Sequence, residues 1–236
     1  MSKCRDRNLL LPLAAINFGI DKAKSYFETR FGDELDAKLA GVPSEYIVEP
    51  KASVAGPAIQ GLAYSFAEDD LRVLYLNLLR TSMDGRNPDA AHPAFVEIIK
   101  QLTATEARLL SQLGRGNLMS ESFGVVQLRS KMGEAEGGGY TTIARHLMDV
   151  DSVMADEEIS IEELTRAVEN WVRLGLFTVD YGTFFADKDA YAWESTVPNL
   201  DLLRKKLEGR NRTLALDHGL LTPTLLGKDF YKAAVG

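Results

Sequence analysis

The feature that most constrains this chain is the stretch from Val54 to Leu113, which carries its longest unbroken helical periodicity. Turn residues interrupt this stretch at Asp84–Pro88, and Pro93 stands at the first position of the next predicted helix. Thr103 and Glu106 then form a capping box that predicts a helix over Ala104–Leu113. Three helices joined by short connections predict a compact bundle. The stripe that faces its core has the i, i+3, i+4, i+7, i+8 spacing and consists of Leu71, Leu74, Tyr75, Leu78 and Leu79.

Further helices and strands are predicted on both sides of this stretch. Upstream, the pattern indicates a helix over Asp21–Ala40 with a break at Gly32-Asp33, and a helix over Ala58–Phe66 that begins behind Pro57. Downstream, Ser160 and Glu163 form a second capping box. The downstream elements are a strand over Phe123–Leu128, helices over Tyr140–Val150 and Ile161–Leu174, a strand over Leu176–Tyr181, a helix over Leu200–Glu208, strands over Leu214–Leu216 and Leu220–Thr222 around a turn at Asp217–Gly219, and a helix over Thr224–Val235.

The order of these elements predicts a mainly α (α+β) fold with two parts. Residues 1–102 are expected to form an N-terminal helical bundle. Residues 103–236 show the order of a winged-helix-like domain with a small antiparallel sheet, interrupted by a Gly-rich insertion over residues 114–139. The prediction depends most on the segment Ile161–Tyr181, where a helix is expected to run straight into a strand.

Composition narrows the classes of function. The chain of 236 residues has 27 Lys and Arg against 34 Asp and Glu, a net charge of −7 that disfavours a general polyanion binder. Cys4 is the single cysteine, so no internal disulfide is possible and a cytoplasmic location is expected. The apolar run Leu9–Ile20 is broken by Pro12 and is shorter than the ~20 residues of a membrane span, so we interpret it as a core or docking segment. Attachment to a membrane surface is its alternative role.

Two loops invite a ligand hypothesis that their residues do not support. The run Gly137–Gly139 lacks the Gly-Lys-Ser/Thr of a phosphate-binding loop and is interpreted as a flexible connection. The acidic segment Asp149–Glu158 lacks the ligand order and central glycine of an EF-hand, which favours a solvated acidic loop over a calcium site.

Several strings resemble one family of bacterial proteins. They are Gly-Pro-Ala-Ile-Gln-Gly-Leu-Ala from Gly56, Ala-His-Pro-Ala-Phe-Val-Glu-Ile-Ile-Lys-Gln-Leu from Ala91, and Leu-Thr-Pro-Thr-Leu-Leu-Gly-Lys-Asp-Phe from Leu221. Together with the amphipathic helix before His92, they resemble the Abi-alpha (abortive infection alpha) family over roughly residues 42–235. The resemblance implies a role in phage resistance, and it carries over no catalytic residue.

The basic residues of the chain cluster once, in the segment expected to form the wing. Arg204, Lys205, Lys206, Arg210 and Arg212 stand there with Glu208 as the opposing acid. Cations in a wing contact the DNA backbone and position a protein without reading sequence. The alternative interpretation is that they complement a helix C-terminus and are otherwise solvated. Acids on the helix that would enter the groove, Glu162, Glu163 and Glu169, favour this alternative.

No set of residues has the spacing of a catalytic or metal site. Asp84, Asn87 and His92 frame one turn, but a nucleophile–base pair needs a third group to orient it. His146 and His218 lack the ligand spacing of a zinc site. We therefore predict no catalytic residues, no metal and no cofactor.

Three hypotheses about function follow. The first is a non-enzymatic interaction protein that acts in phage defence through a protein partner or self-association. The second is a winged-helix DNA-binding regulator, and the third is a toxin-like enzyme centred on His92. The acidic balance and the missing catalytic set favour the first.

Overall fold

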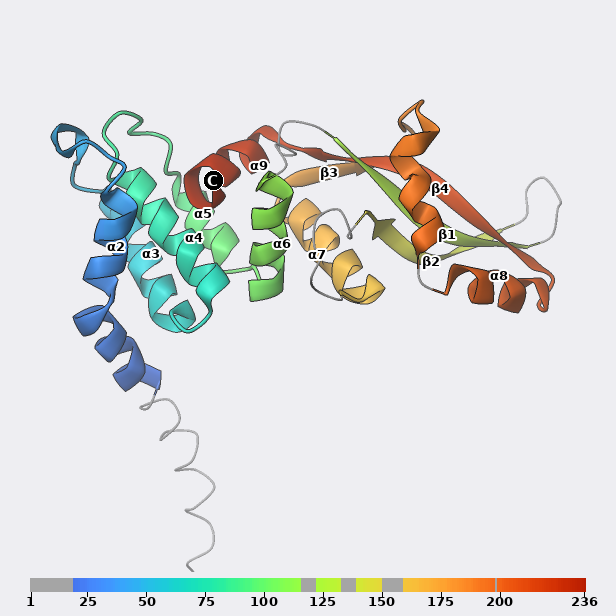
Figure 1. Ribbon diagram of the computed structural model, residues 1–236, viewed down its shortest axis with the longest axis horizontal. Helices are drawn as coiled ribbons and strands as arrows, with labels where there is room; N and C mark the ends of the chain where they lie inside the picture. Colours follow the sequence, from blue (N-terminus) through green and yellow to red (C-terminus); the bar gives the residue numbers. More distant parts are fainter. Residues whose placement is uncertain (1–18, 116–121, 133–138, 150–158, 198) are drawn as a thin grey trace, which may run out of the picture. The chain divides into compact units, whose positions relative to one another are not determined.

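The computed structural model describes residues 19–115, 122–132, 139–149, 159–197 and 199–236 (Figure 1). Cys4, nearly all of the apolar run Leu9–Ile20, Gly137 and Gly138, and nearly all of the acidic segment Asp149–Glu158 lie outside these residues. The chain divides into two compact units, which we describe separately. The N-terminal unit extends to Arg108 and also contains Lys232–Gly236, and the sheet unit comprises Leu109–Tyr231.

The N-terminal unit is helical. A helix over residues 19–29 is followed by a break at Arg30, close to the predicted position, because Arg30 has a φ of −126°. The remaining elements are α2 (Phe31–Leu39), the short turn η1 (Ser44–Tyr46), α3 (Ala52–Ser65), α4 (Asp69–Ser82), α5 (Pro93–Ile99) and the first turn of α6 (Ala104–Arg115). The predicted stripe of α4 is buried, and α4 packs against α2, α3 and α5.

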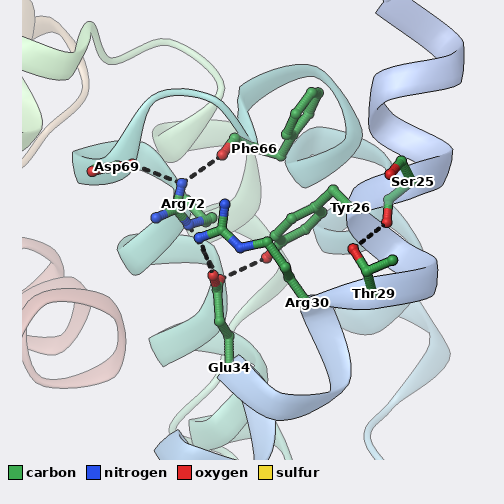
Figure 2. A network of polar contacts seen from close by, with 8 residues as sticks. All are labelled: Ser25, Tyr26, Thr29, Arg30, Glu34, Phe66, Asp69 and Arg72. Atoms are coloured by element: carbon green, nitrogen blue, oxygen red, sulfur yellow. Dashed lines mark hydrogen bonds and ion pairs between the residues drawn. The ribbon is translucent and has the colours of Figure 1, made fainter.

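Glu34 on α2 joins three elements of this unit, as Figure 2 shows. Its carboxylate accepts hydrogen bonds from the Tyr26 hydroxyl at 3.0 Å and from Arg30 Nη2 at 2.6 Å. Arg72 Nε on α4 lies 3.2 Å from the same carboxylate, and Arg72 Nη1 donates to the Phe66 carbonyl at 2.6 Å. The Arg72 side chain is only 13% exposed, so Glu34 and the more exposed Asp69, which lies 2.7 Å from Arg72 Nη1, compensate a cation that is largely removed from water.

Residues 232–236 complete the N-terminal unit although they come last in the sequence. Thr81 Oγ1 donates to the carbonyl of Ala233 at 2.8 Å, and Asn77 Nδ2 donates to that of Ala234 at 3.0 Å. Both carbonyls belong to η4 (Tyr231–Val235), a π-helical turn. Two polar side chains of α4 thus satisfy carbonyls at the end of a helix that lack partners within it.

The sheet unit is built on four antiparallel strands in the order β2-β1-β4-β3. The strands are β1 (Phe123–Met132), β2 (Tyr140–Leu147), β3 (Phe177–Asp180) and β4 (Arg212–Pro223). Its helical elements are the part of α6 from Leu109 onward, α7 (Ile161–Arg173), the 3₁₀ segment η3 (Lys188–Thr196), α8 (Leu200–Glu208) and α9 (Leu225–Phe230). Figure 1 shows β4 starting beside α8 and running the length of the sheet to β3.

The two faces of the sheet are covered by different elements. On one face, Val126, Leu128 and Leu147 form a buried cluster with Tyr191 of η3, and residues of α8 pack against it. On the other face, Trp171 of α7 packs against Phe177 of β3 with ring centroids 5.6 Å apart. Because antiparallel partners share a face, the register of β1 on β4 decides which side chains enter each layer.

Most local predictions are confirmed. Both capping boxes are present: Thr103 Oγ1 accepts from the Glu106 amide, and Ser160 Oγ accepts from the Glu163 amide, each at 3.2 Å. The helix-to-strand segment runs from α7 into β3, with Gly175 between them at a φ of 74°. The coarse class is also confirmed, since the chain is mainly helical with a small antiparallel sheet.

Two sequence predictions in the sheet unit are wrong. Residues predicted as the helix Tyr140–Val150 form strand β2, because β-branched Thr141 and Thr142 pair with Ser130 and Arg129 of β1. The strands predicted over Leu214–Leu216 and Leu220–Thr222 are one strand, β4, and the turn predicted at Asp217–Gly219 does not exist. There the ladder with β1 overrides an Asp-His-Gly sequence that favours a turn.

Two further boundaries differ from prediction. Strand β1 extends to Met132 instead of Leu128, because its partner β4 continues beside it. Helix α3 begins at Ala52 and holds Pro57 inside it, whereas the helix was expected to start after this proline. Pro57 has no N–H to donate to the carbonyl four residues earlier, so the helix tolerates one missing hydrogen bond.

Replacing Glu34 with alanine should lower the free energy of unfolding by about 1–3 kcal/mol, because the largely buried Arg72 would keep only one ionic partner, Asp69, whose side chain is 82% exposed. Glu28→Ala is the matched control, since Glu28 pairs with Lys24 and both side chains are exposed. Its cost should be about 0–0.5 kcal/mol. Urea denaturation followed by circular dichroism measures both values, and equal costs would contradict the role assigned to Glu34.

A methyl group at Gly227 of α9 would collide with the main-chain carbonyl oxygen of Leu176. Gly227→Ala should therefore cost about 1–3 kcal/mol, because the main chain must move. Gly32 in the first turn of α2 has open space around it, so Gly32→Ala should be neutral or stabilising by about 0.5–1 kcal/mol. Thermal unfolding of the two variants tests this packing, and a stabilised Gly227→Ala protein would refute it.

Candidate binding surfaces

The turn between α4 and α5 is held by its own polar groups. Asp84 accepts hydrogen bonds from Arg86 Nε at 2.8 Å and from Arg86 Nη2 at 2.6 Å. These bonds lower the pKa of the Asp84 carboxyl to about 2. His92 caps α5, and its Nδ1 accepts from the Ala94 amide at 3.1 Å. The three residues singled out in the sequence, Asp84, Asn87 and His92, thus have structural contacts, since the Asn87 amide also bonds to the Asp84 carbonyl.

His146 and His218 lie in the sheet unit, and each contacts a tyrosine. His146 has a φ of 57° at an irregularity of β2, where its amide donates to the Tyr181 hydroxyl at 3.0 Å and its Nδ1 lies 3.1 Å from that oxygen. Burial lowers the pKa of His146, which favours the neutral imidazole. His218 Nε2 lies 2.8 Å from a carboxylate oxygen of Glu194, and its ring stacks on Tyr191.

One polar cluster on the sheet was missed by the sequence analysis. Arg129 of β1 pairs with Asp217 of β4, and its guanidinium lies 4.2 Å from the centroid of the Tyr140 ring. Gln127 Nε2 donates to the same Asp217 carboxylate at 3.3 Å. These residues are far apart in the sequence, and only the strand register brings them together. The cation is compensated within the cluster, so we interpret it as a cross-strand contact.

The structure separates the five residues of the predicted basic cluster. Arg212 turns across β1, where its guanidinium donates to Ser130 and Thr141. Arg204 pairs with Asp201 within α8. The remaining three, Lys205, Lys206 and Arg210, are exposed and form no ion pair among the described residues. These three cations lie on α8 and in the turn that leads into β4.

A second exposed surface lies on the N-terminal unit. Tyr46, Ile47 and Val48 are 45%, 40% and 42% exposed, although all three are apolar. The main chain holds them in place, because the Val48 amide donates to the Met83 carbonyl at 3.0 Å and the Gly85 amide donates to the Tyr46 carbonyl at 2.8 Å. We call Tyr46–Val48 the strap. It is a fixed apolar surface, and exposed acids flank it at Glu45 and Glu49.

The described residues contain no group of three His, Cys, Asp or Glu side chains placed to hold a metal ion. No helix among them is both long and apolar enough to cross a bilayer.

Replacing Asp84 with asparagine should lower the free energy of unfolding by about 1–2 kcal/mol at pH 7. The folded-state pKa of Asp84 lies below its unfolded value, so this stabilisation is present above about pH 4 and is lost as the pH falls toward 2. The wild type and the variant should therefore converge at low pH. Asp89→Asn is the control, because its partner Lys51 is exposed, and it should change stability by about 0–0.5 kcal/mol. Urea titrations between pH 2 and 7 give both curves, and a constant difference would contradict the assignment.

Comparison with solved structures finds a low similarity to an uncharacterized protein from the hydrocarbon-degrading marine bacterium Alcanivorax borkumensis SK2. The identity is 15%, the match covers 59% of this chain and 91% of that one, and the TM-score is 0.36. A likeness at this level assigns neither fold nor function. No curated protein matches the chain.

Comparison with family models gives a clear match. The model described as abortive infection alpha matches residues 23–234, which is nearly the whole chain. The match includes α4, α5 and the strand-to-helix joint at Leu221–Phe230, which contain strings that resemble the family. The chain belongs to the abortive infection alpha family.

Proposed function

We propose that this protein acts in phage defence as a non-enzymatic interaction protein that binds a partner protein. The observation that carries the proposal is the strap, because three consecutive apolar residues that are each at least 40% exposed are fixed by main-chain hydrogen bonds. A surface that is already ordered loses little conformational entropy when a partner covers it. The flanking acids Glu45 and Glu49 favour a partner whose apolar contact is bordered by basic side chains.

The contacts of the histidines support binding over chemistry. His92 caps a helix, His146 is hydrogen-bonded to Tyr181, and His218 is paired with Glu194 and stacked on Tyr191. Each imidazole thus has a structural partner. The toxin-like enzyme centred on His92 is accordingly the weakest of the three hypotheses.

A DNA-binding regulator with a winged-helix-like domain is the second candidate function. The exposed Lys205, Lys206 and Arg210 favour it, because such cations bind phosphates. Two observations weigh against it. Strand β2 stands where the winged-helix prediction has its middle helix, and α7 carries three exposed acids, Glu162, Glu163 and Glu169. A gel shift with duplex DNA over a range of salt concentrations tests it, and absence of binding at low salt would remove it.

The proposed function is tested by phage plating on bacteria that express the protein. Expression of the wild type should reduce plaque formation, and Tyr46→Ser with Ile47→Ser should remove that reduction. Because both residues are more than half covered, the double substitution should lower the free energy of unfolding by about 1–2 kcal/mol, and circular dichroism verifies that the variant is folded. Tyr64→Ser is the matched control, because Tyr64 is 81% exposed on α3 outside the strap, and it should keep full protection.

The plating assay also distinguishes the proposed interaction protein from the toxin-like enzyme centred on His92. His92→Asn removes the imidazole and retains a residue that caps a helix, so protection should persist. Loss of protection in a folded His92→Asn protein, together with full protection in the strap variant, would overturn the proposal.

A further inference from the structure

Among the described residues, the sheet has an open edge along β4. Strand β1 pairs with β4 from Arg212 to Leu221, but β3 pairs only with Leu220–Pro223. Among the described strands, residues 212–219 of β4 therefore have a partner on one side only. An edge of this kind presents unpaired N–H and C=O groups to another chain.

Hydrogen bonds at both ends of the sheet show which residues face the open side. The Thr224 amide donates to the Leu176 carbonyl at 2.9 Å, toward β3. The N–H and C=O groups of successive residues point to alternate sides of a strand. Leu214, Leu216 and His218 are an even number of residues from Thr224, so they direct these groups toward the same side as the Thr224 amide. No hydrogen bond from another described residue is found at these three amides and carbonyls on that side.

The pairing of β1 with β2 independently shows which residues of β4 face β1 and which face the open side. The Met132 amide donates to the Gly139 carbonyl, toward β2. Lys131 and Arg129 therefore face β4, where their partners are Thr213 and Ala215. The intervening residues of β4 are left to point outward.

The edge is open because the chain leaves the sheet at Asp180. Its carboxylate accepts from the Gly182 amide and from the Thr183 hydroxyl, each at 2.7 Å. These bonds form a turn that ends β3 after four residues. The eight residues of β4 from Arg212 to Gly219 therefore lie beyond the end of β3 and have no described partner strand on that side.

Exposed cations lie on the helix and in the turn that lead into β4. Lys205 and Lys206 lie on α8, which packs against β4, and Arg210 lies in the turn directly before the strand. None of the three has an ion pair among the described residues. Arg212 points away from the edge toward Ser130, so it does not contribute. Glu208 of α8 is also exposed, so these residues carry a net charge of +2 (three cations and one carboxylate), which favours carboxylates on an incoming chain.

We propose that the edge of β4 from Leu214 to His218 binds an extended segment of a partner protein that carries acidic side chains, added as a fifth strand. The inference goes beyond the proposed function, because it assigns to the sheet unit a second binding site, with a partner chemistry different from that of the strap. Main-chain hydrogen bonds supply the affinity in this mode of binding, and side-chain charge supplies selectivity. Duplex DNA could meet the same cations and its phosphates could accept from the amides, but phosphates donate no hydrogen bond, so the carbonyls of the edge would stay unpaired.

Amide hydrogen exchange measured by NMR tests the edge directly. In the free protein, the amides of Leu214, Leu216 and His218 should exchange fast, while the alternating amides of Thr213, Ala215 and Asp217 should be protected by β1. A synthetic peptide of alternating glutamate and valine should slow the first set by about tenfold or more. Fast exchange in both sets, or protection of the first set before the peptide is added, would overturn the proposal.

Two modified peptides separate the contributions of main chain and charge. The same peptide with alternate amides N-methylated should lose its binding, because it cannot form the ladder. The lysine–valine counterpart should bind at least about tenfold more weakly. Equal binding of the N-methylated peptide, or protection that appears on β2 and not on β4, would refute the assignment.

Charge-reversal variants provide the matched control. Lys205→Glu with Lys206→Glu should weaken binding of the glutamate–valine peptide by about tenfold, whereas Lys22→Glu with Lys24→Glu on the N-terminal unit should leave it unchanged. Duplex DNA is run beside the peptide. Binding of DNA alone, sensitive to Lys205 and Lys206, would overturn the proposal and support the regulator.

Failure of this inference and failure of the proposed function give different results. If the strap variant loses protection against phage and the peptide does not bind, the protein still acts through contacts and the open edge is not its site. If the peptide binds and the strap variant protects fully, the edge is a binding site and the strap is not.

Discussion

The ladder between β1 and β4 is the interaction on which the sheet unit depends. Ten consecutive residue pairs, from Phe123 with Leu221 to Met132 with Arg212, join segments about ninety residues apart in the sequence. This register decides which side chains line each face, and it creates both the Arg129–Asp217 pair and the apolar layer around Val126 and Leu128. A slip of one residue would exchange the two faces, so the long ladder also defines where the sheet is covered and where its edge is open.

The N-terminal unit depends on a different kind of closure. Its helices pack through the apolar stripe of α4, and two sets of polar contacts determine which segments meet there. Glu34 compensates Arg72 where that cation is largely buried, and Asn77 with Thr81 holds the carbonyls of residues 233–234. The second set makes the unit discontinuous in sequence, because the segment Lys232–Gly236 belongs to it and the residues between belong to the sheet unit.

Much of the helical structure could be predicted because its signals are local. The capping boxes at Thr103 and Ser160 were found from two residues each, and the stripe of α4 from its spacing. The wrong predictions concern residues whose secondary structure depends on pairing with another strand. Residues 140–147 carry apolar positions that suit a helix, and the Asp-His-Gly of β4 suits a turn, yet both pair with β1. Of the predicted basic cluster, three residues stay exposed and two are engaged, which spacing along the chain does not reveal.

The sequence by itself determined the helix boundaries that depend on caps, the helix-to-strand joint at Gly175 and membership of the abortive infection alpha family. These properties rest on neighbouring residues or on strings that a family shares. Only the tertiary structure decided the strand register, the burial of Arg72 beside Glu34, the fixed strap and the unpaired edge of β4. The physical reason is that each of these joins main-chain or charged groups distant in the sequence, and their energies depend on desolvation and hydrogen-bond geometry that exist only once the chain is folded.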